Sequence, residues 1–264
     1  MPYGIYIDHD QTIYVADYQN HRIIEWKKGE TNGKIVAGGK GEGSQNDQLN
    51  RPSNVIIDQK NDSLIISDSG NSRIVRWSRQ NGRDGETIIS NIRSNGLAMD
   101  NNNYLYVCDE EKDEVRRWKI GEKNGILVAG GNGKGDHLNQ FNSPTNIFVD
   151  QNDSIYVSDL GNHRVMKWIK GAKEGIVVAG GQGKGNSVKQ LSSPYGIIID
   201  QFETVYVADF GNDRVMRWYK GAKEGNIIVG RNGEGQQANE LNFPTDLSFD
   251  RENNLYVVDY WNHR

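Results

Sequence analysis

Carboxylate, amide and guanidinium side chains recur at a fixed spacing along the chain, in the pattern Asp-x-x-Asn-x-Arg. The aspartates of this series are Asp17, Asp68, Asp159, Asp209 and Asp259. Carboxylates repeated in this way could form a ring of acids or of metal ligands. They could instead accept hydrogen bonds within their own turns, while each arginine pairs with a carboxylate. We favour this structural role, because an active site is usually single and these residues serve nearly every copy.

Four glycine-rich loops of the type Gly-x-x-Gly-x-Gly could in principle cradle a phosphate. They lie at residues 38–43, 130–135, 180–185 and 230–235. A dinucleotide site needs such glycines between a strand and the N-terminus of a helix, and no helical periodicity follows any of these loops. The lysine–serine pair of a P-loop is also missing. We therefore expect no nucleotide and no other cofactor.

The five histidines do not form a recognisable catalytic or metal-binding pattern. His21, His163 and His263 occupy the same turn position in different copies of a repeat, so they cannot converge on one ion, and His9 and His137 lie elsewhere. No Ser-His-Asp or Cys-His arrangement is readable. We therefore expect no catalytic residue, no metal ligand set and no enzymatic activity.

The polar residues are carried by a repeated hairpin. Residues 154–168 read Ser-Ile-Tyr-Val-Ser-Asp-Leu-Gly-Asn-His-Arg-Val-Met-Lys-Trp, which places Gly161 and Asn162 between two apolar runs. Glycine and asparagine tolerate the positive φ that a tight turn often needs, so the stretch predicts strand, turn and strand. Further copies lie at 14–26, 65–77 and 206–218, with a degenerate copy at 106–118 and an incomplete one at 256–264.

A second element, Pro-x-x followed by three mostly apolar residues and Asp, precedes each hairpin, with serine replacing proline in its third copy. Its aspartates are Asp8, Asp58, Asp100, Asp150, Asp200 and Asp250, and they are 50, 42, 50, 50 and 50 residues apart. We expect them to cap the turn after a first strand. In the fourth copy the strand candidates are residues 146–149, 155–157, 164–168 and 176–179.

Four short strands in each period of about 40–50 residues are typical of a β-propeller blade. The sequence therefore predicts an all-β, six-bladed β-propeller of four-stranded antiparallel blades, forming a single domain over residues 1–264. The blade units begin near residues 2, 52, 94, 144, 194 and 244. The last hairpin stops at Arg264, so we expect a truncated sixth blade with an open sheet edge, in a fragment of a longer protein.

The hairpin motif, together with the preceding Pro-x-Gly-apolar-Asp element, resembles the NHL repeat over essentially the whole chain. The resemblance implies a six-bladed scaffold that binds protein or RNA, of a kind often fused to ubiquitin-ligase or receptor parts that are not present here. Six-bladed relatives also include metal-dependent lactonases and lyases with ligands in the central channel. No matching His/Glu set is found here, although Asn54, Asn95 and Asn146 could help to hold a cation such as calcium. Ordinary turn capping is the favoured role of these asparagines.

Two blades depart from the repeat. The second period is eight residues short and lacks the glycine-rich loop. The third hairpin has Lys112 and Glu114 where other copies have asparagine and arginine. Because this turn cannot make the same contacts, we expect the third blade to be the least regular.

Aromatic residues break the symmetry on the face where the turns between second and third strands lie. They are Tyr3, Tyr18, Tyr195, Phe210, Tyr260 and Trp261, from blades 1, 5 and 6. These blades become neighbours when the ring closes, so the rings could form one exposed patch that binds a protein partner. Packing between loops is the alternative, and the sequence does not decide between the two.

Basic residues concentrate in blades 2 and 3 and give the RNA-binding alternative. Its candidate residues are Arg73, Arg76, Arg116 and Arg117. Glutamates are interleaved with them, which favours a mixed, solvated surface, and a net charge of −4 gives no strong attraction to DNA or membranes.

Signals for targeting are absent from the sequence. No signal peptide is visible, and no apolar stretch approaches the roughly 20 residues that cross a bilayer. We expect a monomer that does not bind membranes. The sequence does not fix the compartment, although the missing signal peptide and the single Cys108 favour the cytoplasm.

Overall fold

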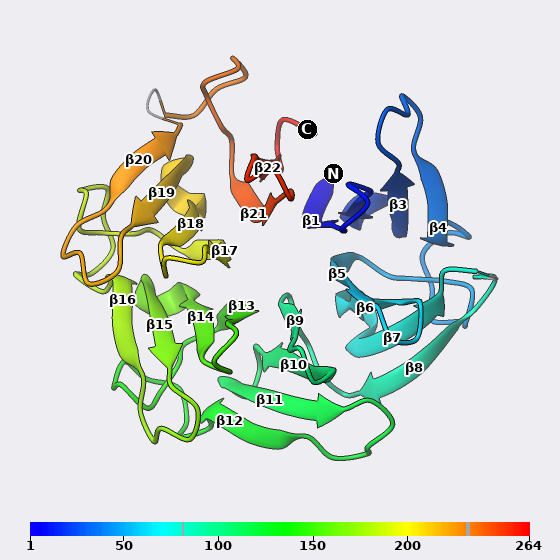
Figure 1. The fold of residues 1–264 in the computed structure, drawn as a ribbon, viewed down its shortest axis with the longest axis horizontal. Coiled ribbons are helices and arrows are strands. Elements are labelled where there is room, and N and C mark those ends of the chain that lie inside the picture. The colour runs from blue at the N-terminus through cyan, green and yellow to red at the C-terminus, as the bar shows by residue number, and fades with distance from the viewer. Residues whose placement is uncertain (81, 231–232) are drawn as a thin grey trace.

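The strands form six antiparallel sheets around a central axis, in a computed structural model that describes residues 1–80, 82–230 and 233–264 (Figure 1). Blades 1 and 2 hold β1 (Pro2–Ile7), β2 (Ile13–Asp17), β3 (Arg22–Trp26), β4 (Lys34–Gly38), β5 (Pro52–Asp58), β6 (Ser63–Asp68), β7 (Arg73–Ser78) and β8 (Gly85–Ser90). Blades 3 and 4 hold β9 (Leu97–Met99), β10 (Tyr104–Asp109), β11 (Glu114–Lys119), β12 (Ile126–Gly130), β13 (Pro144–Val149), β14 (Ile155–Asp159), β15 (Arg164–Trp168) and β16 (Ile176–Gly180). Blades 5 and 6 hold β17 (Pro194–Ile199), β18 (Val205–Asp209), β19 (Arg214–Trp218), β20 (Asn226–Val229), β21 (Pro244–Phe249) and β22 (Leu255–Asp259).

The predicted propeller with a truncated last blade is confirmed. Five sheets have four strands in chain order from the axis to the rim, and the sixth has β21 and β22. The sequence placed the strand at 164–168 correctly and ended the strand at 155–157 two residues early, because Asp159 still pairs with Arg164 across the hairpin. The glycine-rich loop predicted at 230–235 lies partly outside the described residues.

Short 3-10 helices form the turns between the second and third strands of four blades. They are η1 (Tyr18–Asn20), η2 (Ser69–Asn71), η3 (Leu160–Asn162) and η4 (Phe210–Asn212). The turn after the first strand is capped as expected: Asp150 Oδ1 accepts hydrogen bonds from the backbone N–H groups of Asn152 and Ser154, at 2.9 and 2.8 Å.

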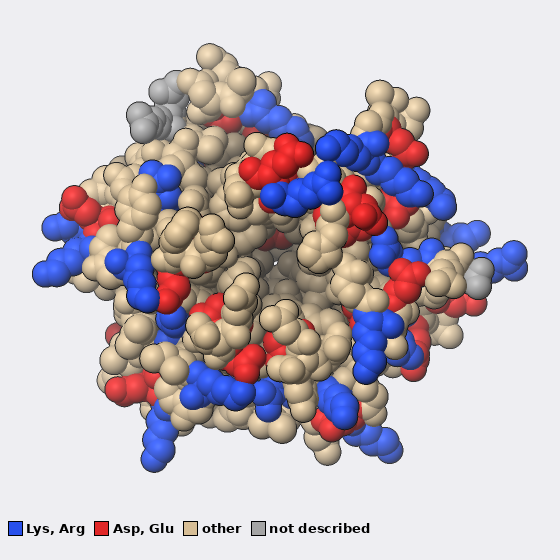
Figure 2. All heavy atoms as spheres, in the orientation of Figure 1, with Lys and Arg blue, Asp and Glu red and all other residues tan. Residues whose placement is uncertain are grey.

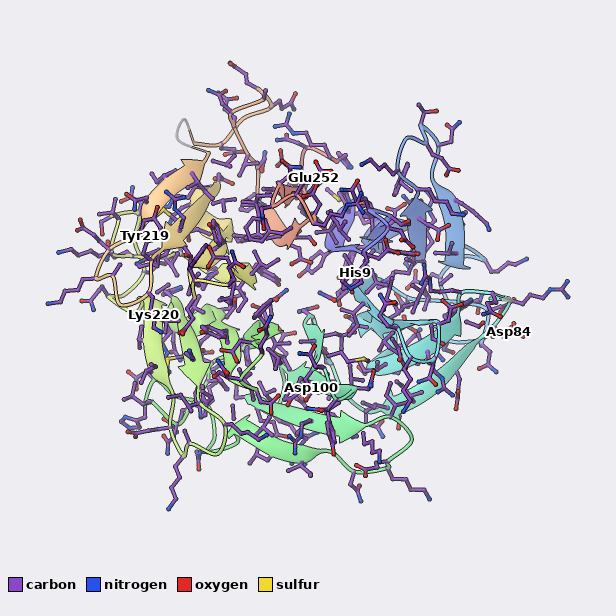
Figure 3. All side chains as sticks on the ribbon, in the orientation of Figure 1. His9, Asp84, Asp100, Tyr219, Lys220 and Glu252 are labelled. Atoms are coloured by element: carbon purple, nitrogen blue, oxygen red, sulfur yellow. The ribbon has the colours of Figure 1, made fainter. Side chains whose placement is uncertain are left out.

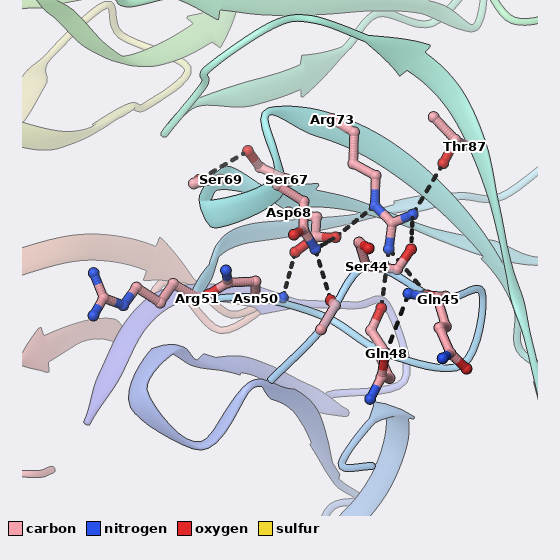
Figure 4. A network of polar contacts seen from close by, with 12 residues as sticks. Ser44, Gln45, Gln48, Asn50, Arg51, Ser67, Asp68, Ser69, Arg73 and Thr87 are labelled. Atoms are coloured by element: carbon pink, nitrogen blue, oxygen red, sulfur yellow. Dashed lines mark hydrogen bonds and ion pairs between the residues drawn. The ribbon is translucent and has the colours of Figure 1, made fainter. Parts of the chain in front are cut away.

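The repeated Asp, Asn and Arg form a clasp, shown for blade 2 in Figure 4. Asn71 Nδ2 and Arg73 Nε donate to Asp68 Oδ2, at 2.7 and 2.6 Å. The other carboxylate oxygen accepts the backbone N–H of Asn50, which lies in the loop leaving blade 1 and not in the turn itself. The terminal nitrogens of Arg73 reach the backbone carbonyls of Ser44, Gln45 and Gln48 in that same loop. The clasp therefore fastens the hairpin of blade 2 to the loop that leaves blade 1.

Wherever a glycine-rich loop precedes a hairpin, the clasp of that hairpin contains an arginine. Arg164 binds the carbonyls of Asp136, His137 and Gln140, and its side chain is only 6% exposed. Arg214 and Arg264 hold the next two loops in the same way. Blade 2 has no glycine-rich loop at its end, and in the next blade, blade 3, Glu114 replaces the arginine.

Blade 3 is the least regular, as expected. Its β9 has three residues, whereas the other innermost strands have six or seven. The expectation that its turn cannot make the same contacts is wrong at one position: Lys112 Nζ donates to Asp109 Oδ2 at 2.8 Å, in place of the asparagine amide of the other blades.

The apolar core lies between neighbouring blades, in five clusters that join blades 1–2 through 5–6. A tryptophan at the end of the third strand is repeated in each of the five four-stranded blades, and Trp168 is almost fully buried. A Cβ added to Gly175 would lie 2.5 Å from the Trp168 ring, so only glycine fits the turn that covers it.

The innermost strands alternate in residue type around the axis. The third residue of the Pro-x-x element is glycine in blades 1, 3 and 5 and an amide or carboxylate in blades 2, 4 and 6; these residues are Gly4, Asn54, Gly96, Asn146, Gly196 and Asp246. A Cβ on Gly96 would lie 2.6 Å from the Cα of Asn146, so glycine permits the close approach of blade 3 to blade 4. The contacts between blades 2 and 3 and between blades 4 and 5 use hydroxyl groups instead. Ser53 Oγ donates to the Ser94 carbonyl at 3.0 Å, and Thr145 Oγ1 donates to the Pro194 carbonyl at 3.3 Å.

The ring closes between β21 and β1 through polar contacts. Asp246 Oδ2 accepts the backbone N–H of Ile5 at 2.9 Å, and Thr245 Oγ1 donates to the Tyr3 carbonyl at 2.8 Å. Asp246 Oδ1 accepts from the Leu247 backbone and from Asn146 Nδ2. Burial raises the pKa of Asp246 from 3.8 to about 7.

The clasp predicts that replacing two arginines at equivalent positions lowers the free energy of unfolding by unequal amounts. Arg164→Ala leaves the Asp159 carboxylate buried without its cation, so we expect the free energy of unfolding to fall by roughly 3–5 kcal/mol. Arg22 contacts Asp17 but no preceding loop among the described residues, and its side chain is 32% exposed. Arg22→Ala should therefore cost about 1 kcal/mol or less. Urea denaturation followed by tryptophan fluorescence measures both; equal losses would contradict the clasp.

The raised pKa of Asp246 predicts a pH-dependent contribution to stability. Between pH 4 and 7 the folded protein keeps a proton on this carboxyl that the unfolded chain has released, so the contribution is greatest at low pH and is lost as pH rises through about 7. Asp246→Asn supplies the residue found in blades 2 and 4 and removes this titration. We expect the Tm of the variant relative to the parent to rise between pH 5 and pH 8. A constant difference would show that Asp246 stays ionised.

Candidate functional site

One face of the propeller carries the turns between the second and third strands and the starts of the innermost strands. The hairpin registers establish this, because Pro144 pairs with Asp159 and Arg164 pairs with Gly180. We call it the loop face. The turns that follow the innermost strands, such as the one containing Phe202, lie on the opposite face.

All six aromatic residues singled out from the sequence meet on the loop face. The rings of Tyr3 and Tyr18 stack with their centroids 5.0 Å apart. Tyr3 also contacts Tyr195 and Tyr260 edge to face, each at 5.7 Å. Phe210 lies 5.2 Å from Tyr195, and Trp261 lies 6.0 Å from Tyr260. Ring closure thus brings together residues that are more than 200 positions apart.

Phe243 completes this aromatic cluster and was missed by the sequence analysis. Its ring lies 4.7 Å from Phe210 and 6.4 Å from Trp261, which closes a circuit of rings from Tyr3 back to Tyr3. Phe243 has a φ of +53°, a region that bulky residues rarely adopt, and its backbone N–H donates to Asp213 Oδ1 at 2.8 Å. The residue before the blade proline is arginine or serine in blades 2, 4 and 5. Comparing the copies of the repeat at that position would therefore have identified Phe243 as a further aromatic exception.

Most rings of the aromatic cluster are half-buried against one another, while Trp261 is 53% exposed. Burial, together with the neighbouring Tyr195 hydroxyl, raises the pKa of Tyr3 well above its usual value. The cluster therefore packs the loops of three blades together and presents one large ring to solvent.

The four arginines of the RNA-binding alternative do not gather into one free basic surface. Arg73 belongs to the clasp, and Arg76 pairs with Glu86 across β7 and β8. Arg116 pairs with Glu114, while the Arg117 guanidinium lies over the Tyr104 ring, 4.5 Å from its centroid. Figure 2 shows basic and acidic side chains interspersed around the rim of one face.

The channel asparagines are arranged differently from the expectation. Asn54 and Asn146 share the inner position with Asp246, but Asn95 does not: Gly96 takes that position and Asn95 Nδ2 donates to Glu110 Oε2 at 3.2 Å. Within the described ranges, no group of three or more His, Cys, Asp or Glu side chains could hold a metal ion.

The histidines of the repeated turn have a structural role. His21 Nδ1 and His163 Nδ1 accept the backbone N–H of Arg51 and Ser193, each at 3.1 Å, at the entry to the next blade. Asp113 and Asp213 accept the equivalent bond in other blades.

Among the described helices, none has the length and apolar character needed to span a membrane.

Comparisons with known proteins agree with this architecture. Residues 241–264 match the family model of the NHL repeat. An auxiliary nutrient binding protein from Bacteroides thetaiotaomicron is 15% identical, with a TM-score of 0.76 over 100% of this chain and 67% of that chain. A chain of a nidogen/laminin complex is 15% identical, with a TM-score of 0.68 over 86% of this chain and 79% of that one.

An enzyme also shares the fold. Virginiamycin B lyase from Staphylococcus aureus is 10% identical, with a TM-score of 0.63 over 98% of this chain and 77% of that chain. These identities carry the fold alone, and a search of curated proteins found no match. The repeated clasp, the ring of blades and the matched repeat lead to one conclusion: the chain is a β-propeller whose residues 241–264 match the NHL repeat.

Proposed function

We propose that this propeller is a non-enzymatic protein-binding module and that the aromatic cluster is its contact surface. The observation that carries the proposal is that the cluster exists in one sector of the ring only. The equivalent positions in blades 2 to 4 hold Ser53, Ser69, Asn95, Glu110, Thr145 and Leu160. Blades 2 to 4 form the same four-stranded sheets without aromatic rings at these positions, so the blade architecture by itself does not require the rings.

The cluster has the physical character of a binding hot spot. Trp261 offers a large ring at the edge of a platform of rings that already support one another. The clasp fixes the turns that carry Tyr18, Phe210 and Trp261, which lowers the entropic cost of binding.

Charge beside the cluster suggests the chemistry of the partner. Arg51 is exposed near Tyr260 and forms no ion pair with any described residue. A protein segment with an apolar or aromatic side chain next to a carboxylate would complement this surface. The lyase of the same fold is the reason to retain an enzymatic alternative, and RNA binding is the other.

Replacing Trp261 tests the proposal. Trp261→Ala should lose about 2 kcal/mol of binding free energy, roughly 30-fold in Kd, because an exposed anchor ring is removed. Its Tm should be nearly unchanged. The matched control is Phe202→Ala, which removes a ring that is 72% exposed on the opposite face. The measurement is quantitative capture by the three proteins, scored for both protein and RNA.

The expected result is a set of proteins held by the parent and by Phe202→Ala but lost from Trp261→Ala. Equal retention by all three proteins would contradict the proposal, and a large fall in the Tm of Trp261→Ala would make the cluster structural. Capture dominated by RNA, weakening steeply with salt and lost on replacing Arg76 and Arg117, would support the RNA alternative instead.

A further inference from the structure

A groove of about 830 Å³ lies on the rim between blades 4 and 5, away from the loop-face cluster. One wall is the outermost strand β16, and the other is the end of β19 with the turn at residues 219–223. Figure 3 labels Tyr219 and Lys220 on this part of the rim. The corresponding groove between blades 3 and 4 measures about 360 Å³, so this volume is not a uniform consequence of the repeat.

The walls of this rim groove expose an unusual amount of apolar surface. Ile169, Ile176, Val177 and Tyr219 are each between 41% and 58% exposed, and all four line the groove. Large apolar side chains exposed singly are normal, but a group of them around one hollow marks a binding surface.

Cations surround this apolar surface. The groove is lined by Lys167, Lys189, Lys220 and Lys223, and by a single acid, Glu203. Glu203 Oε2 accepts from Lys167 Nζ at 2.7 Å and Oε1 from Lys220 Nζ at 2.6 Å. These two ammonium groups lower the pKa of Glu203 to about 2, so it remains charged. Lys189 and Lys223 form no ion pair with a described residue, so positive charge is in excess.

A buried polar group lies at the lining of the same groove. Tyr156 is 1% exposed, and its hydroxyl forms no hydrogen bond with a described residue. That ammonium lies 4.9 Å from the centre of the Tyr156 ring. The apolar walls and the excess of lysines together favour a ligand with both an apolar body and a negative group.

We propose that the rim groove binds an amphipathic carboxylate of the fatty-acid class. The aliphatic chain lies along Ile169, Ile176 and Val177, and the carboxylate lies among Lys189, Lys220 and Lys223. A volume of this size accommodates a small ligand of this kind. The site is separate from the proposed protein-binding surface, so the two proposals stand or fall independently.

Isothermal titration with dodecanoate, kept below its micellar concentration, tests the site. We expect saturable binding of one dodecanoate per chain, and at least tenfold weaker binding of dodecyltrimethylammonium, which has the same chain length and the opposite charge. Dodecanoate affinity should also fall at least tenfold in Ile176→Asp and in Lys223→Glu.

The matched control is Ile126→Asp. Ile126 has the same position in β12 that Ile176 has in β16, with 56% and 52% exposure, but it does not line the groove. Ile126→Asp should bind dodecanoate as the parent does, and all variants should keep the parent Tm. The proposal is overturned if dodecanoate does not saturate, if the cationic amphiphile binds equally well, or if Ile126→Asp weakens binding as much as Ile176→Asp.

Discussion

The pairing of Asp and Arg in every hairpin except that of blade 3 is the interaction on which the propeller depends. The pair is satisfied on all sides: the carboxylate holds an asparagine, an arginine and a backbone N–H, and the arginine holds carbonyls of the loop from the preceding blade. A buried charge is tolerated only when its partners are complete. Each described loop of this kind is therefore followed by a clasp arginine, whereas blade 3 lacks both the preceding loop and the arginine, and its Glu114 pairs with Arg116.

The sequence alone was sufficient for the fold, because a repeat shows which positions every blade needs. It was weaker at contacts between blades. The aspartate of the clasp was expected to bind its own turn, yet in blade 4 its backbone partner is Asn142, 17 residues earlier. Asn95 was placed in the channel because the positions next to the blade proline were compared one residue out of step. Such errors arise because periodicity describes one blade and does not describe the joint with the next.

The two candidate surfaces illustrate the same limit. The aromatic cluster was largely predictable, since rings at positions that hold small or polar residues elsewhere are visible in an aligned repeat; Phe243 required one further position. The rim groove was not predicted. Ile176 in β16 and Tyr219 after β19 each look like an ordinary exposed residue, and only their approach across two blades makes a hollow. Sites between repeats are invisible to a comparison of repeats.

Alternation of glycine with Asn or Asp along the axis gives the inner ring an approximate threefold order within a six-bladed body. Neighbouring blades consequently pack in pairs, in which the glycine of one blade leaves room for the Asn or Asp of the next blade. A ring with an odd number of blades would have to set two like members side by side, leaving either a gap or a collision at the centre. Gain or loss of blades in such an architecture is therefore physically easier two at a time than singly.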